Sequence, residues 1–353
     1  MIGDGTPRRV ALGTGLALGA VKLAQAAEFP TPREGSFIAR DFRFHTRETL
    51  PELRIRYFTL GEPTGQPVLI LHGTAGSARN MLSQAFAGEL FGPGQPLDAQ
   101  RHFIIIPDAL GAAGSSKPSD GLGARFPRYN YADMVQAQHR LVTEGLGIRH
   151  LRLVLGNSMG GMHAWLWGVT YPDFMDAVVP MASQPTEMAS RNWIMRRLLI
   201  ETIRQDPAYN NGNYTTQPPS MRLADVMFSA ATNGGTLHYQ RIAPTREAAD
   251  KLVDERLAAP ARSDANDFIW QWDASRDYNP APLLGRIKAR VLAINAADDE
   301  RNPPETGLMQ AAMQRIPGAR YVLIPASDQT MGHGTTNRAR FWRDELRSFL
   351  GAV

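Results

Sequence analysis

The sequence of 353 residues contains no cysteine, and this absence excludes several chemistries at once. Without a thiol the chain can form no disulfide, use no thiolate nucleophile and offer no cysteine ligand to a metal ion. A strong excess of one charge is lacking too: the formal net charge is +4, and beyond the first 26 residues 35 basic residues stand against 33 acidic ones. So weak a bias gives no reason to expect nucleic acid as a partner.

The motifs of the common cofactor and metal enzymes are also missing. No Gly-x-Gly-x-x-Gly opens a helix after the first predicted strand, and neither a P-loop nor His-Glu-x-x-His occurs. The acidic stretch AADDERNPPE (296–305) contains an arginine and lacks the ligand spacing of a calcium loop. We therefore predict that the protein uses no cofactor and no metal ion.

Residues 1–26 have the pattern of an export signal. Two consecutive arginines (8–9) precede an apolar stretch (10–21), and the small-residue sequence AQA (24–26) follows. This order is typical of secretory signals, and paired arginines are typical of twin-arginine export. The apolar stretch is shorter than the roughly 20 residues that span a bilayer. We predict a periplasmic or secreted protein without stable membrane association after cleavage; the alternatives are an uncleaved anchor and a cytoplasmic protein with a chance Ala/Gly-rich leader.

Short apolar runs recur along the rest of the chain, after an extended lead-in. The predicted strands are RIRYFTL (54–60), PVLILHG (67–73), HFIIIPD (102–108), LRLVLGN (151–157), AVVPMAS (177–183), RVLAIN (290–295) and RYVLIP (320–325). Segments with helical spacing lie between them, for example at 131–147, 159–171 and 341–353. Continuous apolar runs suit strands that are buried on both faces, so the pattern predicts a mostly parallel, doubly wound α/β sheet.

Residues 184–284 interrupt this alternation. The segment has helical stretches such as NWIMRRLLIETIRQD (192–206) and contains no apolar run of the earlier kind. We interpret it as a mostly helical cap over the carboxyl edge of the sheet, inserted between two parts of the core, 27–183 and 285–353; the alternative is a separate domain. Trp193, Trp270 and Trp272 are expected to line a covered cleft beneath this cap.

The sequence Gly156-Asn157-Ser158-Met159-Gly160 joins a predicted strand to a predicted helix. Glycines two positions before and after the serine indicate a turn too tight for side chains there. In this context Gly-x-Ser-x-Gly is typical of a nucleophilic serine, and the amides of the following helix favour negative charge beside it. We predict that Ser158 is a nucleophile.

A nucleophilic serine needs a base, and the base needs an acid to orient it. His333 follows the last predicted strand, and Asp298 and Asp299 follow the preceding one, which gives the chain order Ser, Asp, His. Strand register alone does not separate the two aspartates.

Further site residues are predicted from loop position. The backbone amides of Met159 and Thr74 are predicted to form the oxyanion hole, whereas His72, next to that loop, is interpreted as structural. Leu110, Met162 and Trp193 are predicted to contact substrate.

These residues resemble the α/β-hydrolase superfamily, and more closely its homoserine O-acetyltransferase-like branch. The resemblance covers most of residues 50–350 and is carried by the stretches 91–118, 131–148, 156–183 and 203–214. In that branch the catalytic acid opens an Asp-x-x-x-Pro-Pro stretch, which residues 299–304 match, so the resemblance implies Asp299 rather than Asp298. It also makes a homodimer a reasonable expectation.

Two departures from the branch concern the acyl acceptor. The resemblance implies a Gly-His-Asp sequence whose aspartate reads the acceptor's amino group, but Gly334 follows His333 here. It also implies an arginine after an alanine on a cap helix, where our best match is Ala224-Asp225. Export argues against acetyl-CoA as well. We therefore predict a serine hydrolase of an ester or related small acyl compound; the alternatives are an O-acyltransferase and a non-catalytic binding protein.

Overall fold

The computed structural model describes residue 1, residues 29–260 and residues 263–351. The predicted export signal therefore lies outside the described residues, except for residue 1. Among the described residues, no helix has both the length and the apolar character that crossing a membrane requires.

A mostly parallel sheet of eight strands forms the centre of the molecule, in the order β1-β2-β4-β3-β5-β6-β7-β8. The strands are β1 (Arg33–Arg43), β2 (Thr49–Leu60), β3 (Gln66–Leu71), β4 (His102–Pro107), β5 (Leu151–Asn157), β6 (Met175–Met181), β7 (Arg290–Ala296) and β8 (Arg320–Ile324). β2 pairs antiparallel with β1 and β4, and the remaining pairs are parallel. All the predicted strands are present in this sheet.

The extended lead-in before residue 54 forms strand structure that the sequence analysis did not list. It folds into β1 and the first half of β2, which pair from Arg33 opposite Thr59 to Arg43 opposite Thr49. Only Ala39 and Phe42 of β1 are buried, because this strand lies at the edge of the sheet. β1 thus lacks the continuous apolar run by which most of the other strands were recognised.

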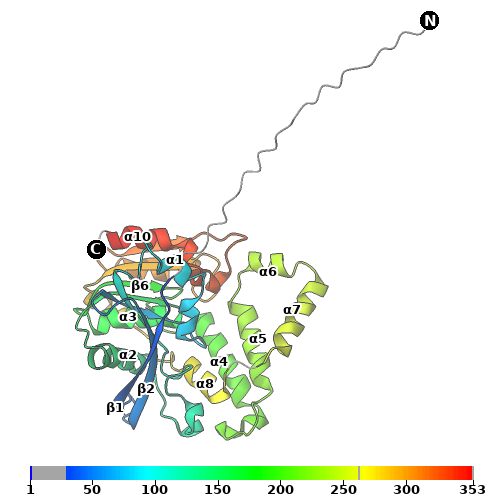
Figure 1. Ribbon diagram of the computed structural model, residues 1–353. Helices are drawn as coiled ribbons and strands as arrows, with labels where there is room; N and C mark the ends of the chain where they lie inside the picture. The colour runs from blue at the N-terminus through cyan, green and yellow to red at the C-terminus, as the bar shows by residue number, and fades with distance from the viewer. Residues whose placement is uncertain (2–28, 261–262, 352–353) are drawn as a thin grey trace.

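Helices cover both faces of the sheet, and successive strand residues alternate between them. The covering helices are α1 (Ala87–Leu90), α2 (Tyr131–Arg140), α3 (Met159–Thr170), α9 (Leu308–Met313) and α10 (Arg343–Gly351). On β3, Val68 and Ile70 belong to the apolar cluster that contains α1 and α10, whereas Leu69 and Leu71 belong to the cluster with α2, α3 and α9. Figure 1 shows α1 and α10 on one side of the sheet and α2 and α3 on the other.

Residues 184–284 contain helices and no strand in the part that the structure describes, which omits 261–262. The helices are α4 (Ser190–Arg204), α5 (Ser220–Thr232), α6 (Thr236–Ile242), α7 (Arg246–Ala258) and α8 (Ala265–Asp273). They lie together beside the sheet, with α6 and α7 farthest from it (Figure 1). Neither α6 nor α7 buries any residue, whereas eight of the nine residues of α8 are buried.

Candidate active site

Ser158 lies in the sharp turn between β5 and α3, with φ 57° and ψ −114°. Such a conformation is strained for a residue with a side chain. The surrounding backbone enforces it: a Cβ on Gly156 would lie 2.0 Å from the Gly160 carbonyl oxygen, and a Cβ on Gly160 would lie 2.1 Å from that of Leu71. The glycines of the sequence motif are therefore required because backbone passes directly against them.

A chain of hydrogen bonds joins Ser158 to His333 and Asp299. His333 lies in the 3₁₀ turn Gly332–Asn337 after β8, and its Nε2 is 2.7 Å from Ser158 Oγ. Its Nδ1 is 2.8 Å from Asp299 Oδ2. Asp299 follows β7, is buried, and accepts further hydrogen bonds from the backbone N–H of Arg301 (2.9 Å) and from Asn302 Nδ2 (2.8 Å). The structure thus brings together the three residues that the sequence analysis selected.

The neighbouring Asp298 makes different contacts. Its Oδ2 accepts hydrogen bonds from Thr330 Oγ1 (2.7 Å) and from the backbone N–H of Gly332 (3.0 Å). Both donors belong to the loop that carries His333. Asp298 therefore holds the histidine loop, whereas Asp299 contacts the imidazole itself.

Burial and charge set the protonation states of this chain. Burial lowers the pKa of His333, and the Arg301 guanidinium lowers it as well, against the opposing effect of the Asp299 carboxylate. Burial by itself would raise the pKa of Asp299, but His333 and the hydrogen-bond donors hold that pKa below its usual value. At neutral pH the imidazole is therefore uncharged, and with Asp299 ionised its proton sits on Nδ1, so Nε2 can accept the hydroxyl proton of Ser158.

Two backbone amides are available to a developing negative charge near Ser158. Met159 is the first residue of α3, and Thr74 lies in the loop after β3. A Cβ on the adjacent Gly73 would lie 3.3 Å from Ser158 Cβ, so this loop passes close to the serine. Within the described ranges neither amide N–H donates to another group. Both are therefore free to bind an oxyanion.

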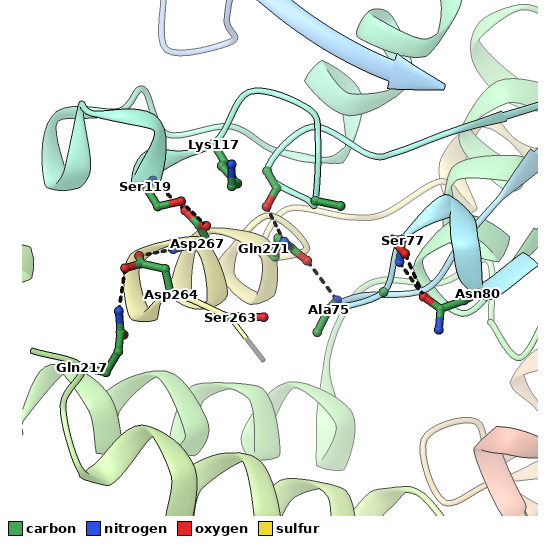
Figure 2. Close-up of a pocket in the computed structure, with 13 residues that line it drawn as sticks. Ala75, Ser77, Asn80, Lys117, Ser119, Gln217, Ser263, Asp264, Asp267 and Gln271 are labelled. Atoms are coloured by element: carbon green, nitrogen blue, oxygen red, sulfur yellow. Dashed lines mark hydrogen bonds between the residues drawn. The ribbon is translucent and has the colours of Figure 1, made fainter. Parts of the chain in front are cut away.

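The loop that carries Thr74 is held by a residue that the sequence analysis missed. Ala75 has φ 57°, an unfavourable value for alanine, and its N–H donates to Gln271 Oε1 at 2.9 Å. Gln271 is buried on cap helix α8, and its Nε2 donates to the Gly111 carbonyl. Figure 2 shows this glutamine between the two loops, in the wall of a cavity of about 630 Å³. Gln271 and Ala75 are 196 positions apart, so no local pattern could reveal the contact.

His72 supports the same region and has no free ring nitrogen for catalysis. Its Nδ1 lies 2.8 Å from the Gly73 carbonyl oxygen, and its Nε2 accepts the N–H of Ala109 at 2.9 Å. Burial lowers the pKa of His72, in agreement with a neutral ring. This is the structural placement that the sequence analysis expected.

Ser158 and His333 open into a cavity of about 730 Å³ between the core and the cap. The core also contributes Arg301 and Gly334, and the cap contributes Asp225, Phe228 and Trp272. Together with the serine turn, the histidine loop and the fold, this cavity has the arrangement of an α/β-hydrolase active site.

Comparison with known families supports that reading, because residues 66–329 match the family described as alpha/beta hydrolase fold. The chain belongs to the α/β-hydrolase family. Members of this family are enzymes, among them esterases and acyltransferases.

Individual relatives indicate the branch of the α/β-hydrolases. A probable acyltransferase from Methanothermobacter thermautotrophicus is 29% identical over 323 residues, which cover 89% of this chain and 97% of that protein. A homoserine O-acetyltransferase from Haloarcula marismortui is 33% identical over 337 residues, covering 87% and 81%. The solved structure of an acetylester hydrolase from Corynebacterium glutamicum has a TM-score of 0.78 at 22% identity, covering 90% and 96%. The chain lies in the homoserine O-acetyltransferase-like branch of the family.

Several predicted pocket residues lie elsewhere in this α/β-hydrolase. Leu110 is buried in the apolar core, and Met162 lines a separate cavity of about 100 Å³. Trp193 is half-buried, with the Arg276 guanidinium 5.1 Å from its ring centre. Trp270 packs under Arg128 at 3.3 Å. Of the three tryptophans only Trp272 lines the cavity with Ser158, because position along the chain does not determine which way a helical side chain points.

The described part of this α/β-hydrolase contains no group of three or more histidine, aspartate and glutamate side chains that could hold a metal ion.

Proposed function

We propose that this protein is a serine hydrolase that cleaves an ester or related acyl compound through an acyl-enzyme. One observation carries the proposal: Ser158 Oγ lies 2.7 Å from His333 Nε2, and His333 Nδ1 lies 2.8 Å from Asp299 Oδ2, at the wall of an open cavity. A serine, an imidazole and a buried carboxylate in this order form a nucleophile, a base and an orienting acid.

In the first half of the reaction Ser158 Oγ attacks the carbonyl carbon of the ester while His333 Nε2 takes the hydroxyl proton. The carbonyl oxygen becomes an oxyanion, which the backbone amides of Thr74 and Met159 stabilise. His333 then gives the proton to the leaving alcohol as the C–O bond breaks. The product of this half is an acyl-enzyme on Ser158 and a neutral alcohol.

In the second half a water molecule repeats these steps. His333 takes a proton from the water as its oxygen attacks the acyl carbon, and the same amides stabilise the second oxyanion. The bond to Ser158 Oγ breaks, the serine recovers its proton from His333, and the carboxylic acid leaves. Asp299 stays ionised throughout and stabilises the imidazolium that forms twice per turnover.

Acyl transfer to an alcohol or amine is the second candidate, because several relatives are acyltransferases. Gly334 favours hydrolysis over transfer. It lines the cavity next to His333, at the position where the resemblance implies a carboxylate for the acceptor's amino group. Asp225 lines the same cavity where an arginine is implied, and it would repel the carboxylate of homoserine.

The test follows the acyl group. Purified protein is incubated with p-nitrophenyl acetate while homoserine is titrated, and free acetate and O-acetylhomoserine are both quantified. We expect acetate at every homoserine concentration. Saturable formation of O-acetylhomoserine would replace hydrolysis by acyl transfer.

Ser158→Ala is the control for this experiment. We expect the variant to lose a factor of about 10⁴ or more in kcat, because the nucleophile and the base act as a unit. Turnover that survived in Ser158→Ala would show that the chemistry lies elsewhere. Absence of turnover in the wild type, on this and other simple esters, would favour the non-catalytic reading.

A further inference from the structure

Arg301 carries a positive charge into the active-site cavity. It lies two residues after Asp299, lines the cavity together with Ser158 and His333, and its Nε donates to Thr232 Oγ1 at 3.1 Å. Its guanidinium carbon is 4.7 Å from the centre of the Phe228 ring. These contacts with the cap fix the guanidinium beside the reacting groups.

This charge has no carboxylate partner. No acidic side chain among the described residues lies within 4.0 Å of the Arg301 guanidinium, and no described group accepts from its two terminal nitrogens. The charges of Asp299 and Glu300 raise the pKa of Arg301, but burial outweighs them and lowers it to about 9. The guanidinium thus remains charged at neutral pH, in a position where that charge is unfavourable.

A second buried guanidinium increases the excess of positive charge. Arg196 is 1% exposed, and its hydrogen-bond partners include Asn192 Oδ1 (2.9 Å) and Ser275 Oγ (3.0 Å), which are neutral groups. Both guanidinium carbons lie near the ring centre of Trp272, Arg196 at 4.9 Å and Arg301 at 5.6 Å. Two guanidinium groups therefore lie near Trp272, and of the two only Arg301 lines the cavity.

The one carboxylate that the cap places in the cavity does not neutralise Arg301. Asp225 Oδ2 lies 3.8 Å from the Arg222 guanidinium on the same helix, and no acidic side chain of the described residues lies within 4.0 Å of the Arg301 guanidinium. Asp299 is occupied by His333, Asn302 and the Arg301 amide. Asp299 and Glu300 therefore act on Arg301 only at a distance, and the terminal nitrogens of its guanidinium are available to an anionic group of a bound molecule.

We infer that Arg301 binds a carboxylate carried by the ester substrate, so that the enzyme prefers esters with an anionic group over their neutral isosteres. This inference rests on the proposed function. The two terminal nitrogens of a guanidinium match a carboxylate as a pair of parallel hydrogen bonds. The carboxylate can belong to the acyl part or to the alcohol part of the ester, and the substrates below separate these two sources.

Two matched pairs of esters test the inference. For the acyl part, monoethyl succinate is compared with ethyl 4-oxopentanoate by ethanol release. For the alcohol part, 4-acetoxybenzoate is compared with 4-acetoxybenzamide by acetate release. We expect the wild type to have the higher kcat/KM for the anionic member of one pair, and that pair identifies the source of the carboxylate.

Arg301→Gln is the decisive variant. We expect it to lower kcat/KM for the preferred anionic ester by about 10- to 100-fold, the usual range for a lost hydrogen bond to a charged group. The neutral member of the pair should change less than about 3-fold. Arg301→Lys keeps the charge without the paired geometry, so we expect it to recover part of the preference. If Arg301→Gln does not fold, Arg301→Lys replaces it, and we then expect a smaller loss of the preference for the anionic ester.

Arg338→Gln is the matched control, because Arg338 lines the same cavity and forms no ion pair with a described residue. It should leave the preference for the anionic ester within about 3-fold. An equal effect of both variants would assign the preference to the general positive field of the cavity and overturn the inference.

A purely structural role of Arg301 between core and cap would give a different result. Arg301→Gln would then reduce activity on anionic and neutral esters equally. A wild type that hydrolyses neutral esters through Ser158 but prefers neither anionic ester would also overturn the inference, while the proposed function would stand. If the turnover of neutral esters did not depend on Ser158, the proposed function itself would be overturned.

Discussion

The loops at the carboxyl ends of the strands and the helices of the cap contribute to the same cavity in different ways. Ser158, Asp299, His333 and Thr74 all follow the carboxyl ends of strands, and backbone passes directly against the glycines that flank Ser158. The cap contributes side chains from helices that lie partly in solvent, and most of the exposed large apolar side chains among the described residues belong to it. The comparison suggests that backbone geometry sets the chemistry, whereas cap side chains set recognition and adjust the loops.

Substitutions of the two adjacent aspartates test which of their contacts the reaction requires, and the largest effect is expected here. Asp299→Asn should lower kcat by about 10³- to 10⁴-fold, because the imidazole loses the carboxylate that orients its tautomer. Asp298→Asn keeps one oxygen for the histidine loop, so we expect a change of less than about 10-fold. Initial rates of p-nitrophenyl acetate hydrolysis measure the change in kcat for both variants. Equal losses would mean that loop position, and not the contact to the imidazole, limits the reaction.

Gly160→Ala tests whether backbone collisions hold the serine turn. The new Cβ would meet the Leu71 carbonyl oxygen at 2.1 Å, so α3 or β3 must shift. We expect a loss of about 3 kcal/mol of stability and a fall of roughly 4–5 °C in Tm, measured by calorimetry. Gly285→Ala is the control, because a Cβ there has no atom within 4 Å. Similar melting of both variants would refute the collision argument.

Gln271→Leu tests whether the cap adjusts the chemistry through the oxyanion loop. Without the bond to the Ala75 amide, the strained loop should relax and the Thr74 N–H should lose its position. We expect kcat to fall by about 10- to 30-fold with KM nearly unchanged, less than the loss of a whole oxyanion donor. Steady-state kinetics on a neutral ester measures the two constants separately.

Gln138→Leu is the control for that variant. Gln138 is equally buried and accepts from Trp167 Nε1 at 2.9 Å, but it has no contact with the oxyanion loop. We expect a lower Tm and an unchanged kcat. A comparable fall in kcat in both variants would show that the effect of Gln271 is general destabilisation.

The smallest effect is expected on the outer face of the cap. Met227 on α5 is 59% exposed, so Met227→Gln should change stability by less than about 0.5 kcal/mol and leave kcat unaltered. Thermal melting and light scattering at several protein concentrations measure this. A clear fall in Tm or in molecular mass would show that this face is covered in solution, as the predicted homodimer would require.

The sequence analysis succeeded where a local pattern encodes the structure. The buried strands have continuous apolar runs, and the serine turn has glycines that the backbone requires. His333 could be selected because the order of strands along the chain determines which loops meet at the carboxyl ends of the strands. These features depend on short segments and on topology, which a sequence carries directly.

Other features depend on contacts between distant residues and could not be derived in this way. β1 is mostly exposed at the sheet edge, so its pattern is weak. Gln271 reaches its loop across the cap interface, and neither Leu110 nor Met162 lines the cavity that contains Ser158. The difference between Asp298 and Asp299 also depends on side-chain direction, and only the resemblance to the homoserine O-acetyltransferase-like branch favoured one of them.

Arg301 divides two tasks between its backbone and its side chain. Its N–H helps to orient Asp299, and every residue except proline can supply that hydrogen bond. Arg301 also lines the cavity. If its guanidinium binds the substrate carboxylate, as inferred above, a point mutation at this codon changes which esters are accepted while the backbone hydrogen bond to Asp299 is kept. Substrate range could then change during evolution at a position two residues from Asp299.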